Sequence, residues 1–270
     1  MALADAAMAA GRPIFVVGLE GESEPAIERF PHGWVRIGAM GKFLNMLKEE
    51  GCAEIVMIGP VTRPDLTRIK PDLTGVKLLP RFLKMMRQGD DGLLRGVIDF
   101  LEKDHGLKVI APEDVSADLL APQGPIGRHQ PNENNLNDIS QAAKVVRAIG
   151  ALDIGQGAVV CRGVVLAVEA AEGTDAMLDR LLELSATLKG TAEAREGVLV
   201  KLPKPGQERR IDLPTIGVQT IEKAAAAGLA GIAVEAGGAL IYDVAAVARA
   251  ADAAGLFVTG LEPAATEAAR

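Results

Sequence analysis

The stretch Ala158–Leu178, AVVCRGVVLAVEAAEGTDAML, indicates how this chain is folded. Two apolar runs, Ala158–Cys161 and Val164–Val168, are separated by the tight turn Arg162-Gly163, which predicts a β-hairpin. A cluster of polar residues follows the second run, and a helical pattern begins directly after it. A strand that passes through a charged junction into a helix is typical of an α/β protein.

The same alternation of strands and helices continues toward the N-terminus. Apolar runs at Pro13–Gly18 and Glu54–Gly59 predict buried strands, and a shorter run at Val76–Leu79 suggests another. Between them, Gly41–Glu50 has the spacing of an amphipathic helix. Continuous apolar strands between helices predict a parallel sheet covered on both faces. We therefore expect an α/β protein with two domains, an N-terminal Rossmann-like parallel-sheet domain and a C-terminal mixed α/β domain.

The segment Ala121–Pro131, APQGPIGRHQP, is the best candidate for the boundary between these domains. Its three prolines and two glycines are typical of a loop rather than of a helix or strand. We predict an N-terminal domain over residues 1–122, a linker over 123–131 and a C-terminal catalytic domain over 132–270. A helix over Asn137–Ile149 opens the second domain, with Asp138 as a candidate cap.

Composition excludes several classes of protein. The chain has 270 residues, a formal net charge of −7 and only 3% aromatic residues, which disfavours nucleic acid as a partner. No apolar run approaches the roughly 18 residues of a membrane span, and the first ten residues lack the basic start of a signal peptide. Cys52 and Cys161 match neither a metal-site nor a disulfide spacing. We therefore predict a cytoplasmic protein.

The junction after the hairpin carries the first candidate site. Glu169, Glu172 and Asp175 place three carboxylates within seven residues, beside the free N–H groups of a helix start. Carboxylates close to a helix start that binds anions need a cation between them. Mg²⁺ is the natural choice, because it prefers oxygen ligands and can bind carboxylates and phosphates together. Gly173 would let the backbone approach a ligand, and the Thr174 hydroxyl would face its oxygens. The alternative is that Thr174 or Asp175 only caps the helix.

The second candidate site is the segment Lys201–Gly217, KLPKPGQERRIDLPTIG. Lys201, Lys204 and Arg210 are basic residues in a loop stiffened by prolines, and Asp212 is a carboxylate among them. Such a loop could clamp a phosphate beside one metal-binding carboxylate. The alternative is a solvated basic loop.

A third candidate is Arg63 in the motif GPVTRPD, which follows the predicted strand Glu54–Gly59. Loops at the carboxyl ends of parallel strands are where such sheets bind ligands. The alternative is a simple turn.

The segment Leu79–Gly89, LPRFLKMMRQG, predicts an amphipathic helix with one basic face. The apolar face would consist of Leu79, Phe82, Leu83 and Met86. The opposite face would carry Arg81, Lys84 and Arg87. A helix of this kind can lie on an anionic membrane, and the alternative is a packed helix whose basic face is solvated.

The residues alone thus predict a protein that binds a phosphorylated small molecule with Mg²⁺. A nicotinamide-dependent oxidoreductase is a weaker alternative, because no G-x-G-x-x-G motif follows the first strand. A sugar-nucleotide-binding regulator without catalysis is another. Binding a diphosphate without a metal would not favour so many carboxylates, which argues against it.

The quoted motifs also resemble a known family. Asp153–Leu178 and Lys201–Gly217, together with GPVTRPD at Gly59–Asp65 and GDDGLLR at Gly89–Arg95, closely resemble the LpxI-type UDP-2,3-diacylglucosamine pyrophosphatases of Gram-negative bacteria. The resemblance covers nearly the whole chain. It implies two α/β domains and a Mg²⁺-dependent hydrolysis in lipid A biosynthesis. UDP-2,3-diacylglucosamine would give 2,3-diacylglucosamine 1-phosphate (lipid X) and UMP, with water attacking the α-phosphorus.

The resemblance also implies roles for individual residues. Asp212 is similar to the key acidic residue of the family, so it would be the catalytic residue and a Mg²⁺ ligand, with Glu169, Glu172 or Asp175 completing the metal shell. The residues that would bind the substrate are Arg63, Gln156, Gly157, Gly173, Thr174, Lys201, Lys204, Gln207, Arg210 and Thr215.

Two expectations concern the chain's ends and its surroundings. Family members open with a strand and a Gly-Gly-Gly loop before a first helix, and Met1–Gly11 resembles only the end of that helix, so we expect a preceding segment. A substrate with two acyl chains implies peripheral attachment to the inner face of the cytoplasmic membrane. Assembly into a homo-oligomer is left open.

Overall fold

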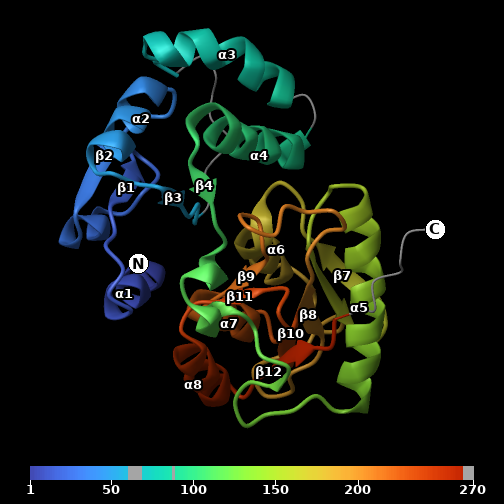
Figure 1. Cartoon of the computed structure of the whole chain (residues 1–270). Helices are drawn as coiled ribbons and strands as arrows, with labels where there is room; N and C mark the ends of the chain where they lie inside the picture. Colours follow the sequence, from blue (N-terminus) through green and yellow to red (C-terminus); the bar gives the residue numbers. More distant parts are fainter. Residues whose placement is uncertain (60–68, 87–88, 264–270) are drawn as a thin grey trace. The chain divides into compact units, whose positions relative to one another are not determined.

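A computed structural model describes residues 1–59, 69–86 and 89–263 of the chain (Figure 1). The chain divides into two compact units, Met1–Ala117 and Asp118–Arg270. Both units mix helices with strands, so the predicted α/β class is confirmed. The segment 123–131, predicted as a linker, lies within the second unit, where Gly124–Pro125 form a short strand of its main sheet.

The first unit contains short parallel strand pairs and four α-helices within its described residues. Its regular elements are α1 Ala2–Ala9, β1 Val16–Leu19, β2 His32–Val35, α2 Met40–Glu49, β3 Glu54–Ile55, α3 Leu73–Met86, α4 Gly89–Asp99 and β4 Lys108–Val109. Short helical turns lie at Pro25–Arg29, Phe100–Asp104 and Pro112–Asp114. Strand β1 pairs with β2 and β3 with β4, both in parallel. Parallel pairing was predicted, but the strands are shorter than the apolar runs suggested.

One predicted strand of this unit is wrong. The run Val76–Leu79 lies inside α3, a single helix that continues through the segment expected to be helical after it. A run of four residues with three apolar ones fits a strand or a helix turn equally well, so periodicity over so short a run does not decide between them.

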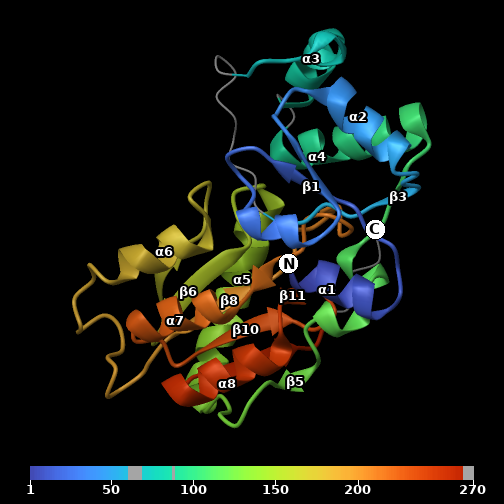
Figure 2. The same cartoon turned by 90° about the vertical axis from the view of Figure 1, so that its left-hand side faces the viewer.

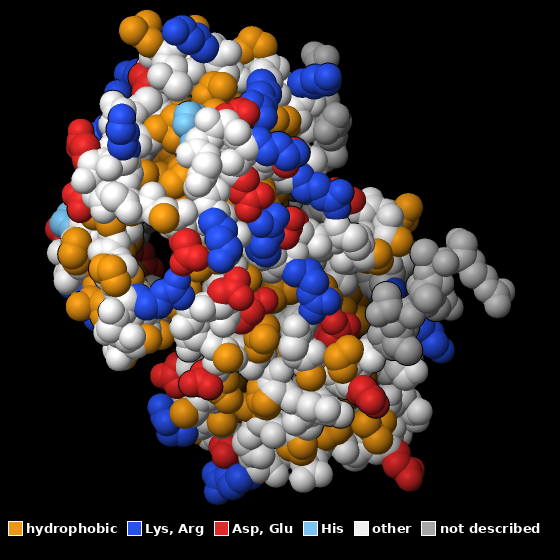
Figure 3. Space-filling view, viewed as in Figure 1, with side chains coloured by type: hydrophobic (Ala, Val, Ile, Leu, Met, Phe, Trp, Pro, Cys, Tyr) orange, Lys and Arg blue, Asp and Glu red, His pale blue; other side chains and the backbone are white. Residues whose placement is uncertain are grey.

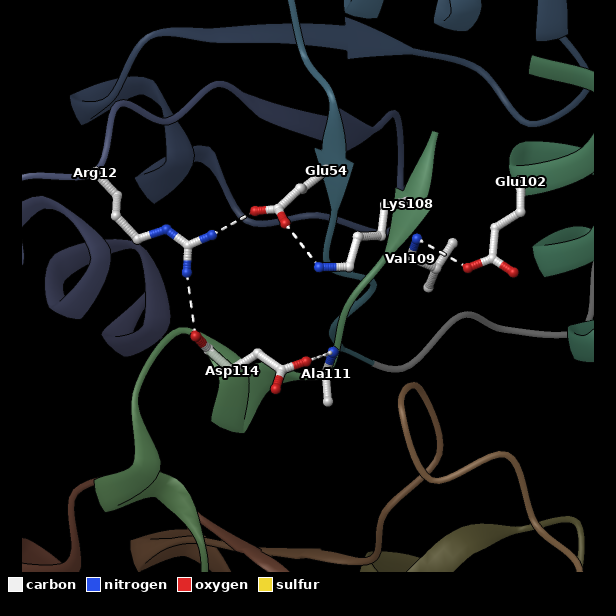
Figure 4. Close-up of polar contacts among 7 residues, drawn as sticks. All are labelled: Arg12, Glu54, Glu102, Lys108, Val109, Ala111 and Asp114. Atoms are coloured by element: carbon white, nitrogen blue, oxygen red, sulfur yellow. Dashed lines mark hydrogen bonds and ion pairs between the residues drawn. The ribbon is translucent and has the colours of Figure 1, made fainter. Parts of the chain in front are cut away.

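Charged side chains connect α1's end, β3 and the segment after β4 (Figure 4). The Arg12 guanidinium donates to the Glu54 carboxylate over 2.6 Å and to the Asp114 backbone oxygen over 3.1 Å. Lys108 Nζ donates to the other Glu54 oxygen over 3.2 Å. We call Arg12, Glu54 and Lys108 the exposed ion network, because their side chains are 37%, 39% and 70% exposed.

The second unit is built around a six-stranded mixed sheet with strand order β5-β12-β10-β8-β6-β7. Its elements are β5 Gly124–Pro125, α5 Glu133–Ala151, β6 Gly157–Cys161, β7 Val164–Val168, α6 Gly173–Leu181, β8 Val198–Lys201, β9 Thr215–Ile216, α7 Val218–Ala226, β10 Gly231–Glu235, β11 Leu240–Ile241, α8 Val244–Ala254 and β12 Phe257–Leu261. Strands β8, β10 and β12 run parallel to one another. Strand β5 is antiparallel to β12, and β6 is antiparallel to both of its neighbours, β7 and β8. Strands β9 and β11 form a separate parallel pair.

Helices cover both faces of this sheet (Figures 1 and 2). Val159, Leu199 and Ile232 point to the side of α6, α7 and α8, where they join one fully buried apolar cluster. Their neighbours in the strands, such as Val160 and Val200, point to the side of α5 and join a second cluster. Because side chains alternate along a strand, a strand that is apolar at every position is buried on both faces.

The hairpin quoted first is confirmed as β6 and β7, and α5 holds its turn. The buried Asp138 carboxylate accepts hydrogen bonds from the N–H groups of Arg162 (3.0 Å) and Gly163 (2.8 Å). Asp138 therefore does not cap α5, contrary to the prediction. The helix begins four residues earlier than Asn137, at Glu133, and Asn132 caps it by accepting from the N–H of Asn135.

Candidate active site

The candidate site lies at one edge of the six-stranded sheet, where several strands end together. Strands β7, β8 and β10 have their carboxyl ends at this edge, and the antiparallel β6 begins there. In the register, Gly157 of β6 pairs with Lys201, the last residue of β8. On its other side, the Gly157 oxygen accepts from the N–H of Glu169, the residue that follows β7. Residues far apart in sequence thus lie in one row.

A buried hydrogen-bond chain crosses this row. Lys201 Nζ donates to the Thr174 hydroxyl oxygen over 2.6 Å, and the Thr174 hydroxyl donates to Glu169 Oε1 over 3.0 Å. Lys201 also donates to the backbone oxygen of Thr215 over 3.3 Å. We call Lys201, Thr174 and Glu169 the buried ion network, since Lys201 is only 4% exposed and Glu169 only 7%.

Gly157 leaves the space in which this network forms. A Cβ atom at Gly157 would stand 2.4 Å from Glu169 Oε2, far inside van der Waals contact. Strand β6, with Gly157, lies between Lys201 at the end of β8 and Glu169 just after β7, so the missing side chain at Gly157 leaves room between them. Glu169 Oε2 is buried and has no hydrogen-bond partner among the residues that the structure describes. A buried acceptor of this kind is costly unless a donor or a cation reaches it.

Burial lowers the pKa of Lys201 below its ordinary value of 10.5. The negative charges of Glu169, Asp175 and Asp212 oppose this effect and favour the ammonium form. The three carboxylates come from the end of β7, the first turn of α6 and the loop before β9. The carboxylates at the junction after the hairpin therefore lie around Lys201, the last residue of β8.

Gln207 organises the loop that carries Asp212. This buried side chain donates from Nε2 to Asp212 Oδ2 over 2.5 Å and to Gln156 Oε1 over 3.2 Å. Its Oε1 accepts from the N–H of Lys204 over 2.8 Å. One amide thus joins the two halves of the 201–217 loop to the segment that enters β6.

The other predicted cations each have an acceptor within the chain. Lys204 Nζ donates to Asp153 Oδ1 over 2.7 Å. Arg210 bonds both carboxylate oxygens of Glu208, from Nε over 2.9 Å and from Nη2 over 3.0 Å. The loop is therefore not a set of solvated charges. A phosphate that binds Lys204 or Arg210 has to share or replace these acceptors.

The polar residues that begin α6 are arranged differently from a simple cap. Glu172, and not Thr174 or Asp175, stands at the cap position, and its side chain makes no cap hydrogen bond. The Thr174 hydroxyl bonds Glu169 and Lys201 instead. Glu172 instead forms an ion pair with Arg180 over 2.6 Å. Gly173 has a φ of +78°, a left-handed conformation that favours glycine.

The structure brings most of the predicted site residues together and leaves one undescribed. Gln156, Gly157, Glu169, Thr174, Lys201, Gln207, Asp212 and Thr215 are joined by the contacts above. Arg63 lies outside the described residues. Sequence reasoning missed Asp153, the acceptor of Lys204, although its place at the start of the motif DIGQG was a usable signal.

The carboxylates fit a Mg²⁺ ion only in part. The described residues hold no group of three His, Cys, Asp or Glu side chains able to enclose a metal. Mg²⁺, however, is commonly held by one or two carboxylates together with substrate phosphates. Asp212 suits this role, because ligating carboxylates are usually oriented by a further hydrogen bond such as the one from Gln207. Glu172, paired with Arg180, is less suited.

A buried lysine, convergent carboxylates and a basic loop at the carboxyl ends of parallel strands are typical of an enzyme that acts on a phosphorylated ligand. Comparison with known proteins gives the family. The LpxI N-terminal domain model matches residues 1–119, and the LpxI C-terminal domain model matches residues 122–259. The chain belongs to the LpxI family.

A curated relative agrees with this assignment. The UDP-2,3-diacylglucosamine pyrophosphatase LpxI of Caulobacter vibrioides is 49% identical over 261 residues, which are 97% of this chain and 93% of the relative. The predicted family and the prediction of an enzyme of the hydrolase class are thereby confirmed.

Proposed function

We propose that this chain hydrolyses UDP-2,3-diacylglucosamine to 2,3-diacylglucosamine 1-phosphate and UMP, with Mg²⁺ as cofactor, in lipid A biosynthesis. The observation that carries the proposal is the 49% identity to a pyrophosphatase of that name over nearly the whole chain. The polar network at the sheet edge supplies the charged groups that such a reaction needs. Its cations can neutralise a diphosphate, and its carboxylates can hold a metal or orient water.

In the proposed mechanism, Asp212 would hold Mg²⁺, which when bound supplies positive charge to the phosphoryl oxygens. Gln207 fixes the direction of the Asp212 carboxylate. Lys201 holds the start of α6 against β8 through Thr174, so that the first N–H groups of that helix keep one orientation toward a phosphate. Lys204 and Arg210 would exchange their acceptors, Asp153 and Glu208, for diphosphate oxygens.

No side chain of this network is needed as a covalent nucleophile if water attacks the α-phosphorus directly. The attacking oxygen then ends in UMP, and the sugar phosphate leaves with its bridging oxygen. Hydrolysis in ¹⁸O-labelled water should therefore place the label in UMP and not in the lipid product. Label in the lipid product would contradict attack at the α-phosphorus.

The test of the activity itself is release of UMP from the detergent-solubilised substrate. We expect release that requires added Mg²⁺ and stops when EDTA is added. A chain that bound the substrate without releasing UMP would contradict the proposal and favour a regulator.

The amphiphilic substrate also leads us to propose peripheral attachment to the inner face of the cytoplasmic membrane. No helix among the described residues combines the length and the apolar character that crossing a bilayer requires. A cytoplasmic location remains our prediction, and a homo-oligomer remains open.

A further inference from the structure

Helix α3, Leu73–Met86, presents an apolar stripe to solvent instead of burying it. Leu73 is 85% exposed, Val76 53% and Leu83 38%, and the side chain of Pro80 is also exposed. These positions recur at intervals of three and four residues, so they lie along one side of the helix. Single exposed apolar side chains are common, but a line of four along a helix is not.

The opposite side of α3 explains why this stripe faces outward. Gly75 packs so closely that an added Cβ would stand 2.1 Å from the Gly38 oxygen. Phe82 makes an edge-to-face contact with Phe100, with ring centroids 6.1 Å apart. Met85 packs on α4 at Gly96. The inner side is therefore already filled by its own apolar residues.

Arg81 lies between the two sides of the helix, with its side chain 39% exposed. Its guanidinium forms an ion pair with Asp104 and lies 5.7 Å from the centre of the Phe100 ring. The predicted faces are wrong for Leu83, which is exposed beside the basic residues, whereas Lys84 is exposed as predicted. Arg87 lies outside the described residues.

Two lysines border the exposed apolar stripe. Lys77 and Lys84 are exposed and fall one residue after Val76 and Leu83, on the same side of the helix. The sequence of α3 contains no Asp or Glu. The chain as a whole carries a net charge of −7, so this side is basic within an acidic protein. Figure 3 shows hydrophobic and basic side chains next to one another over the α3 region.

We propose that the outward side of α3, formed by Leu73, Val76, Lys77, Pro80, Leu83 and Lys84, is the surface that docks on an anionic lipid bilayer. The apolar side chains would enter the boundary between headgroups and acyl chains, while the lysines meet lipid phosphates. The long lysine stems allow this arrangement, because they lie along apolar surroundings and keep the ammonium groups in water. A bilayer suits this side because apolar and basic groups alternate along it and α3 itself contributes no acidic residue. This docking surface rests on the proposed function in one respect only, which is that the bilayer is the cytoplasmic membrane.

The experiment measures binding to vesicles without substrate. Purified protein is sedimented with vesicles that contain phosphatidylglycerol and, separately, with vesicles of phosphatidylcholine alone. We expect binding to the anionic vesicles that weakens on addition of salt. The variant Leu73→Ser/Val76→Ser/Leu83→Ser should lose binding at least tenfold, and Lys77→Gln/Lys84→Gln should lose it several-fold.

A matched control removes one exposed apolar and one exposed basic side chain elsewhere in the first unit. Met8 is 53% exposed and Lys48 is exposed on α2, so Met8→Ser/Lys48→Gln should leave vesicle binding unchanged. Thermal unfolding checks that each variant is folded. The apolar positions are solvent-exposed, so we expect the same midpoint as in the wild type.

Three results would overturn the docking surface. These are equal binding by the α3 variants and the wild type, equal binding to neutral and anionic vesicles, and a dimer in size-exclusion chromatography that the serine variant dissociates. Hydrolysis of detergent-solubilised substrate is measured in parallel and should be the same in all variants. If the wild type fails to release UMP, the proposed function fails, whereas the vesicle result still decides the docking surface.

Discussion

The buried ion network and the exposed ion network both place lysine or arginine next to glutamate, but their settings differ. Lys201 is 4% exposed and reaches Glu169 through a hydroxyl, whereas Arg12 and Lys108 hold Glu54 at the surface. In the interior the surrounding carboxylates decide whether the lysine stays charged, and a missing partner leaves a charge without solvent. At the surface water replaces a missing partner. A short donor–acceptor distance alone therefore does not show how much a contact contributes to stability.

The largest expected effect is at the carboxylate closest to the proposed chemistry. Asp212→Asn keeps the shape and the contact with Gln207 but removes the negative charge that would hold Mg²⁺. We expect the rate at saturating Mg²⁺ to fall by about 100-fold, roughly 3 kcal/mol of barrier. Circular dichroism should show an intact fold. A variant that kept more than about a tenth of the wild-type rate, a loss of only ~1.4 kcal/mol, would show that Asp212 is not the key carboxylate.

The next effect tests whether the buried network is a unit. Lys201→Met removes the ammonium group and leaves Thr174 and Glu169 without their cation. We expect the free energy of unfolding to decrease by about 1–3 kcal/mol, together with a lower rate, since burial without a partner is costly. Denaturant unfolding at neutral pH measures the first quantity. Unchanged stability would mean that this network behaves like the surface one.

A smaller effect on the rate is expected at Gln207, which would act on the reaction only by orienting Asp212. Gln207→Leu removes the hydrogen bond that orients Asp212 while preserving the size of the side chain. The kcat value should fall about tenfold with little change in KM, because misplacement of a catalytic group affects the transition state more than substrate binding. Gln207→Glu serves as the comparison, since it adds a second carboxylate beside Asp212. A change confined to KM would instead place Gln207 among the groups that bind the substrate.

The lowered pKa of Lys201 gives a pH dependence whose sign can be stated. Below the folded-state pKa, Lys201 is protonated in both the folded and the unfolded chain, so this group makes no contribution to the pH dependence of stability. Between that pKa and 10.5, the unfolded chain binds more protons than the folded one, so the free energy of unfolding rises with pH. The difference in stability between the wild type and Lys201→Met should therefore grow across this window. A difference that is independent of pH would show that the pKa of Lys201 is not lowered.

The smallest effect is expected in the exposed ion network. Arg12→Met and Glu54→Gln should each change the free energy of unfolding by less than about 1 kcal/mol, because solvent screens these side chains. The same denaturant titration that is used for Lys201→Met provides the comparison. A loss as large as that of Lys201→Met would remove the distinction between the two networks.

Much of the candidate site was predictable from the sequence because its residues lie in two continuous motifs. Lys201, Gln207 and Asp212 share the segment Lys201–Gly217, and Glu169 and Thr174 share the junction after the hairpin. The opposite charges of the two motifs predict that they face one another around a ligand, but their direct contact was not predictable. Strand register places Lys201 beside the junction carboxylates, across Gly157. The Mg²⁺ ion itself stays a prediction.

By itself the sequence determined the α/β class, the hairpin and the family, since these depend on local periodicity, turn residues and motif spacing. Only the tertiary structure decided which polar groups are buried and which apolar groups are exposed. A helical period shows that α3 has two sides, but not which one the unit covers. That choice follows from distant contacts, with Gly75 against Gly38 and Phe82 against Phe100. Likewise Lys201 is buried because β6 and β8 pair in one register, a long-range contact that no local pattern encodes.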